Sequence, residues 1–384
     1  MKAPSLLSVS LLTAIIPASS AFLQPTLFAI STRLHSNVVG IQEDLTFSPP
    51  NTAETISEQL CAEAASKMKR VMVPVSSDVS DTGYVGISYI HWEGQKKSQQ
   101  QALCPLLLVH GFDSSSLEYR RLGPQLANLG IDVYCVDLLG WGYTQLDGVK
   151  SFSAQAKVDA LRGFWQTVGN NAQVVVGGAS LGGAAVIEFA SQNLYYPQND
   201  DKTGFVRGTV LIDAQGFVDG IGPMSFLPTP LAKLGIQVLK STPLRETANQ
   251  MSYYDPATYA TVDALNVGRI HCLRDGWEES MLSFMQSGGF RPKEKVSQIS
   301  VPSLVLWGRQ DGILDGEEFA NKFVEIMPEA ELKWVEECGH VPHLEKPVET
   351  AEYIYEFLKE ERVRPERKDN GVPSVFEGLL SLLK

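Results

Sequence analysis

The sequence predicts an α/β protein with a mostly parallel central sheet, flanked by helices and carrying an inserted helical lid. Short apolar runs alternate with amphipathic stretches of helical length along most of the chain. The alternation stops once, between residues 216 and 291, where helix-like pieces rich in Met, Pro and aromatic residues follow one another without a clear strand. Because parallel strands need crossover helices on their faces, the alternating parts predict the sheet and the interruption predicts the lid.

The expected strands are short and mostly apolar. They cover residues 84–92, 104–109, 131–136, 174–176, 208–212, 302–307 and 330–335. Residues between them show the helical recurrence of apolar positions, which predicts helices over 52–69, 117–129, 152–168, 184–194, 317–326 and 348–360. Pro124 is expected to break or kink the second of these helices.

Composition limits the classes of function. The chain has 384 residues, 44% of them hydrophobic, and a net charge of −12. This acidic balance argues against nucleic acid as a partner, because nucleic-acid binding needs a basic surface. The five cysteines are scattered and never form a C-x-x-C pair, which favours free thiols over disulfides or zinc. We expect no cofactor and no metal site.

The first residues have the layout of a targeting sequence. Lys2 precedes an apolar run from Leu6 to Ile16, and small residues end at Ala21, which predicts a signal peptide over 1–21. The next segment, to residue 42, contains Arg33, several Ser and Thr, and no acid, as in transit peptides. A signal peptide joined at Phe22 to such a segment resembles the two-part plastid presequences of diatoms and related algae. The resemblance implies the plastid of an alga with a secondary plastid; secretion is the alternative.

The strongest local signal is a G-x-S-x-G pattern at Gly178 to Gly182, between a predicted strand and a predicted helix. This context makes a sharp turn that lifts the Ser180 hydroxyl clear of the sheet. The same turn places the backbone N–H of Leu181 at a helix N-terminus, where it can stabilise a developing oxyanion. Ser180 is therefore the candidate nucleophile.

A serine nucleophile needs a histidine base and an acid that orients the histidine. Of the six histidines, His340 follows the last predicted strand, so it faces the same edge of the sheet as Ser180. Asp311 follows the preceding strand and gives the chain order Ser, Asp, His. Asp213, at the end of another strand, remains the competing acid. We expect His343 to pack in its loop through local hydrogen bonds.

A second oxyanion donor is expected in the loop after the strand that ends at Val109. Gly111 lets the backbone approach closely there, and the N–H of Phe112 would pair with that of Leu181. His110 is expected to support this loop. Asp137, with Gly140 and Gly142, fits a role in stabilising a turn.

Taken in order, these residues resemble the α/β-hydrolase fold family. The resemblance rests on His110-Gly111, Asp137-x-x-Gly140-x-Gly142, Gly178-x-Ser180-x-Gly182-Gly183, Gly308-x-x-Asp311 and Gly339-His340, and it covers residues 84–361. It implies a triad of Ser180, Asp311 and His340. Segments 268–273 and 283–289 further resemble plastid hydrolases of plants and algae. Ala179 stands where the family usually has His or Asn, which suggests an unusual substrate, and Thr144 replaces a frequent Ser.

These features predict a serine hydrolase that cleaves an ester or related acyl bond. Carbon–carbon bond hydrolysis, acyl transfer and a catalytically silent ligand-binding protein remain alternatives. The lid is rich in apolar residues, which favours a small apolar substrate unless these residues only pack the lid. They are Met224, Phe226, Leu227, Leu231, Leu234, Met251, Tyr253, Tyr254, Met281, Phe284 and Met285.

The expected organisation follows from these assignments. It comprises a signal peptide (1–21), a transit-peptide-like segment (22–50), an N-terminal helical extension (51–83), a first core part (84–215), the lid (216–295), a second core part (296–361) and a C-terminal tail (362–384). The apolar end of the tail, from Phe376, suits packing on the domain or contact with a membrane. The oligomeric state is not predicted.

Overall fold

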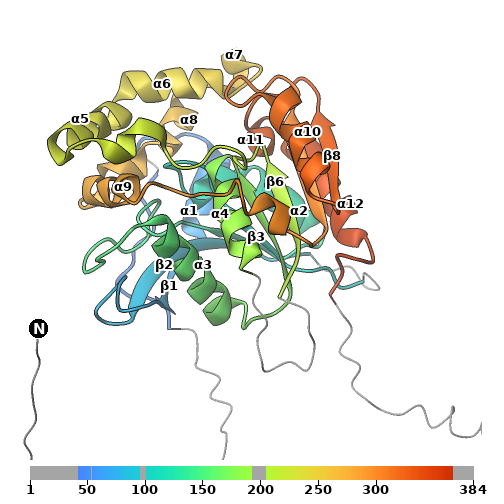
Figure 1. Ribbon diagram of the computed structural model, residues 1–384, viewed down its shortest axis with the longest axis horizontal. Helices are drawn as coiled ribbons and strands as arrows, with labels where there is room; N and C mark the ends of the chain where they lie inside the picture. Colours follow the sequence, from blue (N-terminus) through green and yellow to red (C-terminus); the bar gives the residue numbers. More distant parts are fainter. Residues whose placement is uncertain (1–41, 53, 96–100, 193–204, 366–384) are drawn as a thin grey trace, which may run out of the picture. The chain divides into compact units, whose positions relative to one another are not determined.

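A computed structural model of the chain describes residues 42–52, 54–95, 101–192 and 205–365 (Figure 1). The expected signal peptide, nearly all of the transit-peptide-like segment and most of the C-terminal tail lie outside the described residues. The described residues all belong to the unit that begins at Ile41.

The described unit is built on one sheet of eight strands, in the order β1-β2-β4-β3-β5-β6-β7-β8. The strand β2 pairs antiparallel with β1 and β4, and all other neighbours are parallel. The fold is thus the expected α/β type with a mostly parallel sheet. The strands are β1 (Met68–Pro74), β2 (Tyr84–Trp92), β3 (Leu106–Val109), β4 (Val133–Val136), β5 (Val174–Ala179), β6 (Val206–Ile212), β7 (Ser303–Gly308) and β8 (Ala330–Val335).

The N-terminal part differs from the expectation of one helix over 52–69. Only α1 (Gln59–Ser66) is helical, and β1 begins two residues later. The apolar spacing that suggested a longer helix ends at Met68, which is buried because it starts a strand. Val71 and Val73 of β1 are fully buried, and the strand pairs with β2 along its whole length. Tertiary pairing therefore overrides the helical pattern here.

Helices cover both faces of the sheet. One apolar cluster lies under α3 (Ala154–Val168), α4 (Leu181–Ser191) and α10 (Gly316–Ile326), and a second lies under α1, α2 (Leu122–Asn128) and α12 (Pro347–Lys359). The helix expected over 117–129 is two elements, a 3-10 turn (η1, Ser116–Arg120) followed by α2. The break comes before Pro124, which lies in the first turn of α2, where a proline removes no helical hydrogen bond.

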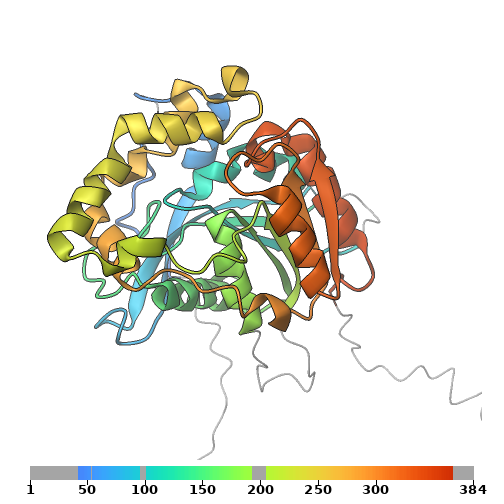
Figure 2. The same cartoon turned by 45° about the horizontal axis from the view of Figure 1, so that its top comes forward.

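Between β6 and β7 the chain forms helices only, as the sequence predicted. We call residues Gly222–Gln286 the helical insertion. Figures 1 and 2 show its helices α5 and α6, in yellow, lying above the sheet. Its elements are η2 (Gly222–Phe226), α5 (Thr229–Lys240), α6 (Thr242–Met251), α7 (Pro256–Tyr259), α8 (Val262–Val267), η3 (Ile270–Leu273) and α9 (Trp277–Gln286).

Two further short elements follow the insertion in the described chain. They are η4 (Val296–Gln298) before β7 and α11 (Pro342–Glu345) after β8. No helix in the described ranges is both long enough and apolar enough to cross a membrane.

Candidate active site

Ser180 lies at the tight turn between β5 and α4. Its backbone has φ 51° and ψ −121°, a conformation that costs free energy for a residue with a side chain and is typical of functional sites. The turn is held by backbone hydrogen bonds, because the Ser180 N–H donates to Ile212 O at 2.9 Å and the Ser180 carbonyl accepts from Gln215 N at 2.9 Å. The surrounding sheet therefore holds the strained serine in place.

The glycines on either side of Ser180 are required by close packing. A Cβ on Gly178 would lie 2.4 Å from the backbone of Gly182, and a Cβ on Gly182 would lie 2.3 Å from Val109 O. Both distances are far below van der Waals contact. The G-x-S-x-G spacing thus follows from the tightness of the turn.

The structure brings Asp311 and His340 together. Nδ1 of His340 lies 2.8 Å from Oδ2 of Asp311, and both side chains are buried. The other carboxylate oxygen of Asp311 accepts the N–H groups of Ile313 and Leu314. Burial favours the neutral acid, but the hydrogen bonds from His340 and from the backbone outweigh it and hold the pKa of Asp311 below its usual value. Asp311 is therefore ionised at neutral pH.

Asp213, the competing acid, lies beside this pair without bonding to the histidine. It is fully buried, with φ 42°, and its Oδ1 accepts the Gly308 N–H at 3.0 Å. Burial and the neighbouring negative charge of Asp311 raise the pKa of Asp213 well above its usual value. The shift favours the protonated form of Asp213, and His340 takes its hydrogen-bonded acid, Asp311, from the loop after β7.

His340 has one free ring nitrogen. Its backbone N–H donates to Ser252 O of the helical insertion at 2.8 Å, and Nδ1 faces Asp311. Among the described residues, Nε2 of His340 and Oγ of Ser180 make no hydrogen bond with each other.

The two expected oxyanion donors are also placed at this edge. A Cβ on Gly111 would lie 3.5 Å from the Ser180 Cβ, so the loop after β3 runs directly beside the serine. Within the described part of the chain, the N–H groups of Phe112 and Leu181 make no backbone hydrogen bond.

Two glutamates that the sequence analysis did not single out hold these loops. Glu118 accepts the Gly111 N–H at 3.2 Å and lies 3.0 Å from Nε2 of His343. Burial opposes ionisation, but the imidazole of His343 beside the carboxylate outweighs it and lowers the pKa of Glu118 to about 2. Nothing in the sequence separates Glu118 from a surface glutamate, because its partner His343 lies far away along the chain.

Glu345 plays the corresponding role beside His340. Its carboxylate accepts three backbone N–H groups, from Gly339 at 2.8 Å, Tyr254 at 3.1 Å and Asp255 at 2.8 Å. Glu345 thereby ties the histidine loop to the helical insertion.

Two residues given supporting roles by the sequence behave as expected. Nδ1 of His110 bonds to Gly111 O at 2.8 Å and its Nε2 accepts the Leu138 N–H at 3.0 Å, so His110 supports the loop. Asp137 accepts the Ser116 and Tyr143 N–H groups and stabilises its turn.

One other expectation needs correction. His343 does not bond locally, because its ion-pair contact is Glu118 on η1.

Ala179 is 1% exposed within the apolar cluster under α2 and α12, so its small side chain faces the core. The unusual substrate that this residue suggests stays a prediction.

Two groups of side chains bring metal-ligand types within 4.8 Å of one another: Asp113, His271 and Cys272, and Asp213, Asp311 and His340. In the first group the Asp113 carboxylate already accepts hydrogen bonds from Arg245 and Trp277. In the second group the ionised oxygens of Asp311 are taken by His340 and by backbone N–H groups. These donor sets fit hydrogen-bonded networks better than a metal ion.

The fold and the residues at its carboxyl edge define a class of protein. A model of the Alpha/beta hydrolase family matches residues 106–353, so the chain belongs to this family. The matched range contains Ser180, Asp311 and His340, and each of them follows a different parallel strand.

Among curated proteins, the chain is 30% identical over 85% of its length to the Arabidopsis thaliana protein named "Alpha/beta hydrolase domain-containing protein VTE7", covering 94% of that protein. It is 26% identical over 66% of its length to Lipase 1 of Psychrobacter immobilis, covering 76% of the lipase. Among solved structures, an esterase from Thermogutta terrifontis aligns with a TM-score of 0.58 at 20% identity, covering 75% of this chain and 97% of the esterase. The chain is thus related to lipases and esterases of this fold.

Proposed function

We propose that the protein is a serine hydrolase with Ser180 as nucleophile, His340 as general base and Asp311 as the acid that orients the histidine. The observation that carries the proposal is the 2.8 Å contact between His340 Nδ1 and Asp311 at the edge of the sheet where Ser180 is held at φ 51°. A neutral imidazole that donates from Nδ1 has a lone pair at Nε2, which is what a serine base requires.

The arrangement supports a two-step reaction. His340 takes the Ser180 proton as Oγ bonds to the substrate carbonyl carbon, and the N–H groups of Phe112 and Leu181 donate to the resulting oxyanion. When the tetrahedral intermediate collapses, the bond to the leaving group breaks and His340 returns the proton to the leaving alcohol. Water then attacks the acyl group by the same route and releases the acid.

The substrate is proposed to be a small apolar ester. Phe112 is the proposed oxyanion donor, and Ile313 lies two residues after Asp311. Their side chains expose 38% and 43% of their surface. Met251, 53% exposed, joins them because its carbonyl lies 3.4 Å from the Cβ position of Gly312. These apolar side chains around the site suit an apolar acyl or alcohol chain better than a charged one.

Not every apolar residue of the proposed lid supports this substrate class. Among the described side chains, Tyr253, Met281, Phe284 and Met285 are buried and pack the domain, whereas Phe226, Leu231, Leu234 and Tyr254 are exposed. Of these lid residues, only the exposed ones can add to the apolar surface offered by Phe112, Ile313 and Met251.

Carbon–carbon bond hydrolysis is the second candidate. The chain is 28% identical over 66% of its length to a protein of Burkholderia vietnamiensis named "2-hydroxy-6-oxononadienedioate/2-hydroxy-6-oxononatrienedioate hydrolase". The name of that substrate implies two carboxylates, which the exposed apolar side chains of Phe112, Ile313 and Met251 do not match. We therefore favour ester cleavage.

The test is active-site labelling with a fluorophosphonate, followed by turnover of p-nitrophenyl esters of increasing chain length. The wild-type protein should label and should prefer the longer esters. Ser180→Ala and His340→Ala should not label, whereas Ser191→Ala, a control on the same helix, should behave as wild type. A folded wild-type protein that does not label would favour the ligand-binding alternative.

We also propose that residues 1–42 direct the protein to a plastid. Fusing residues 1–60 to a fluorescent protein tests this in an alga with a secondary plastid. Fluorescence in the plastid supports the proposal, and fluorescence in the medium supports secretion.

A further inference from the structure

The loop beside Ser180 contains a buried carboxylate that the proposed reaction does not use. Asp113 follows the oxyanion donor Phe112 directly, has φ 46° and is 3% exposed. Left-handed backbone is uncommon for aspartate and must be stabilised by its surroundings.

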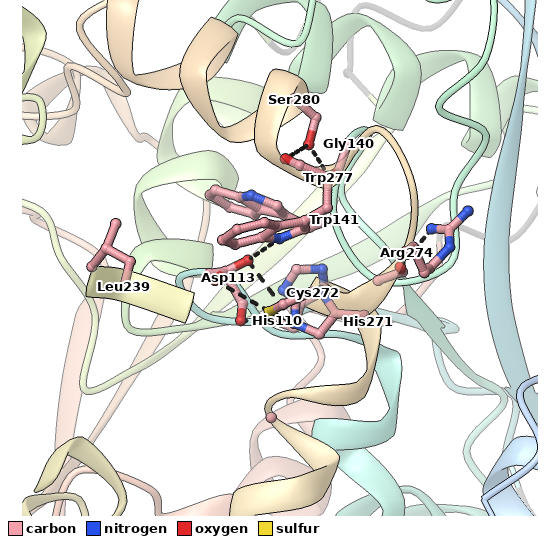
Figure 3. Close-up of polar contacts among 12 residues, drawn as sticks. His110, Asp113, Gly140, Trp141, Leu239, His271, Cys272, Arg274, Trp277 and Ser280 are labelled. Atoms are coloured by element: carbon pink, nitrogen blue, oxygen red, sulfur yellow. Dashed lines mark hydrogen bonds and ion pairs between the residues drawn. The ribbon is translucent and has the colours of Figure 1, made fainter. Parts of the chain in front are cut away.

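Among the described residues, the side chains that contact Asp113 come from the helical insertion, and Figure 3 shows three of them, His271, Cys272 and Trp277, around it. Its carboxylate pairs with Arg245 Nη2 and accepts from Trp277 Nε1 at 2.8 Å. Its backbone carbonyl lies 2.9 Å from His271 Nε2, and the Cys272 thiol lies 3.6 Å from Oδ2. Three separate elements, α6, η3 and α9, therefore converge on one residue of the core.

Arg245 is itself held rigidly. Its Nε donates to Leu239 O at 2.9 Å and its Nη1 donates to Gly268 O at 2.7 Å. The guanidinium thus joins the end of α5, the end of α8 and the core loop, and its planar geometry sets where the Asp113 carboxylate can lie.

The two neighbours of Phe112 are restrained from opposite sides. Gly111 is held by Glu118 of the core, and Asp113 is held by the insertion. Phe112 lies between them with its N–H unpaired among the described residues. The direction of this N–H is therefore set by two anchors, one of which belongs to the insertion.

We propose that Asp113 is a positioning residue through which the helical insertion aims the Phe112 N–H at the oxyanion. The inference rests on the proposed serine hydrolase function. It assigns the insertion a part in stabilising the transition state, in addition to any contact with substrate. Loss of the contacts between Asp113 and the insertion should slow acylation. Binding of the uncharged ester should stay nearly unchanged, because the oxyanion exists only after attack.

The central experiment compares Asp113→Asn with wild type on one p-nitrophenyl ester. Asparagine keeps the size of the side chain but turns an amide donor or a neutral oxygen toward Arg245. We expect kcat to fall about 30-fold, less than the roughly 100-fold that accompanies complete loss of a donor, with KM within about twofold of wild type. The affinity of an alkyl trifluoromethyl ketone, which forms an oxyanion on the serine, should fall by the same factor as kcat/KM.

Two further variants keep the test decisive. Asp44→Asn is the matched control, because Asp44 forms a partly buried pair with Arg70 at 2.7 Å elsewhere in the fold, and it should leave kcat unchanged. If Asp113→Asn does not fold, Arg245→Lys replaces it, since lysine keeps the charge but cannot hold Leu239, Gly268 and Asp113 together. Its kcat should fall about tenfold.

Unchanged kcat in folded Asp113→Asn, or in Arg245→Lys, overturns the inference, as does a rise in KM with kcat preserved. These outcomes are separate from failure of the proposed function. A wild-type protein that does not react with fluorophosphonate contradicts the proposed hydrolase function. Equal rates of reaction in wild type and Asp113→Asn contradict only the positioning role of Asp113.

Discussion

The two sides of the site use buried carboxylates differently. On the oxyanion side (residues 110–118), Asp113 and Glu118 each face a side chain that can carry positive charge, Arg245 and His343. On the histidine side (residues 308–345), Glu345 accepts only backbone N–H groups and Asp311 accepts from His340 and the backbone. The pKa of Asp213, next to Asp311, is raised instead. Among Glu118, Asp311 and Asp213, the direction of the pKa shift thus follows the partners and not the depth, because all three side chains are largely or fully buried.

Both sides are also tied to the helical insertion, through Asp113 on one side and through Glu345 and Ser252 on the other. The insertion therefore contacts the loops that carry the proposed oxyanion donor and the proposed base. A change in its position is expected to alter both loops.

The largest predicted effect separates the two acids of the histidine side. Asp311→Asn should lower kcat about 10⁴-fold, because asparagine does not stabilise the Nδ1–H tautomer or the imidazolium. Asp213→Asn should leave kcat within a few-fold of wild type, since asparagine resembles the protonated form that burial favours and makes no bond to His340. Steady-state kinetics of the two purified variants checks this. Comparable losses in both would mean that Asp213 is ionised.

Asp213→Asn is also expected to raise stability at neutral pH. The folded protein keeps a proton that the unfolded chain releases above its ordinary pKa near 3.8, so the native carboxyl costs stability as pH rises. Denaturant titrations of wild type and variant at acid and neutral pH should show the difference widening toward neutral pH. A pH-independent difference would contradict the proton on Asp213.

Glu345→Ala should have the next largest effect, on folding. It leaves three N–H groups without an acceptor at the junction of insertion and core, which we expect to cost about 3–5 kcal/mol of unfolding free energy. Urea unfolding measures this loss, and Glu352→Ala, an exposed position on α12, is the control. A loss below about 1 kcal/mol would mean that water satisfies these groups.

The smallest predicted effect is a pH dependence on the oxyanion side. Burial lowers the pKa of His271 from 6.5 to about 4, so the unfolded chain binds a proton in this window and the folded protein does not. The free energy of unfolding should therefore not depend on His271 above pH 6.5. It should decline by at most about 3 kcal/mol as pH falls toward 4. His271→Gln keeps an N–H donor for Asp113 O and should flatten this part of the pH profile. An identical profile in wild type and variant would exclude His271 as its source.

Much of the sheet was predictable because its strands are continuous apolar runs that end at polar turns. The bounds of β2 and β8 match the sequence interpretation, and the candidate residues Ser180, Asp311 and His340 follow strands that the sequence indicated. The strand β1 was missed because its apolar positions continue a helical spacing, and only pairing with β2 makes Met68 part of a strand.

The sequence by itself determined the order of the strands and helices after β1, the tight turn at Ser180 and the candidate residues for catalysis. These depend on local periodicity and on the steric need for glycine, both of which are short-range properties. The tertiary structure decided which acid faces His340, in which direction the pKa of Asp213 and of Asp311 is shifted, and how Asp113, Glu118 and Glu345 hold the loops. These outcomes depend on burial and on charges from residues far apart in the chain, and such contacts exist only after folding.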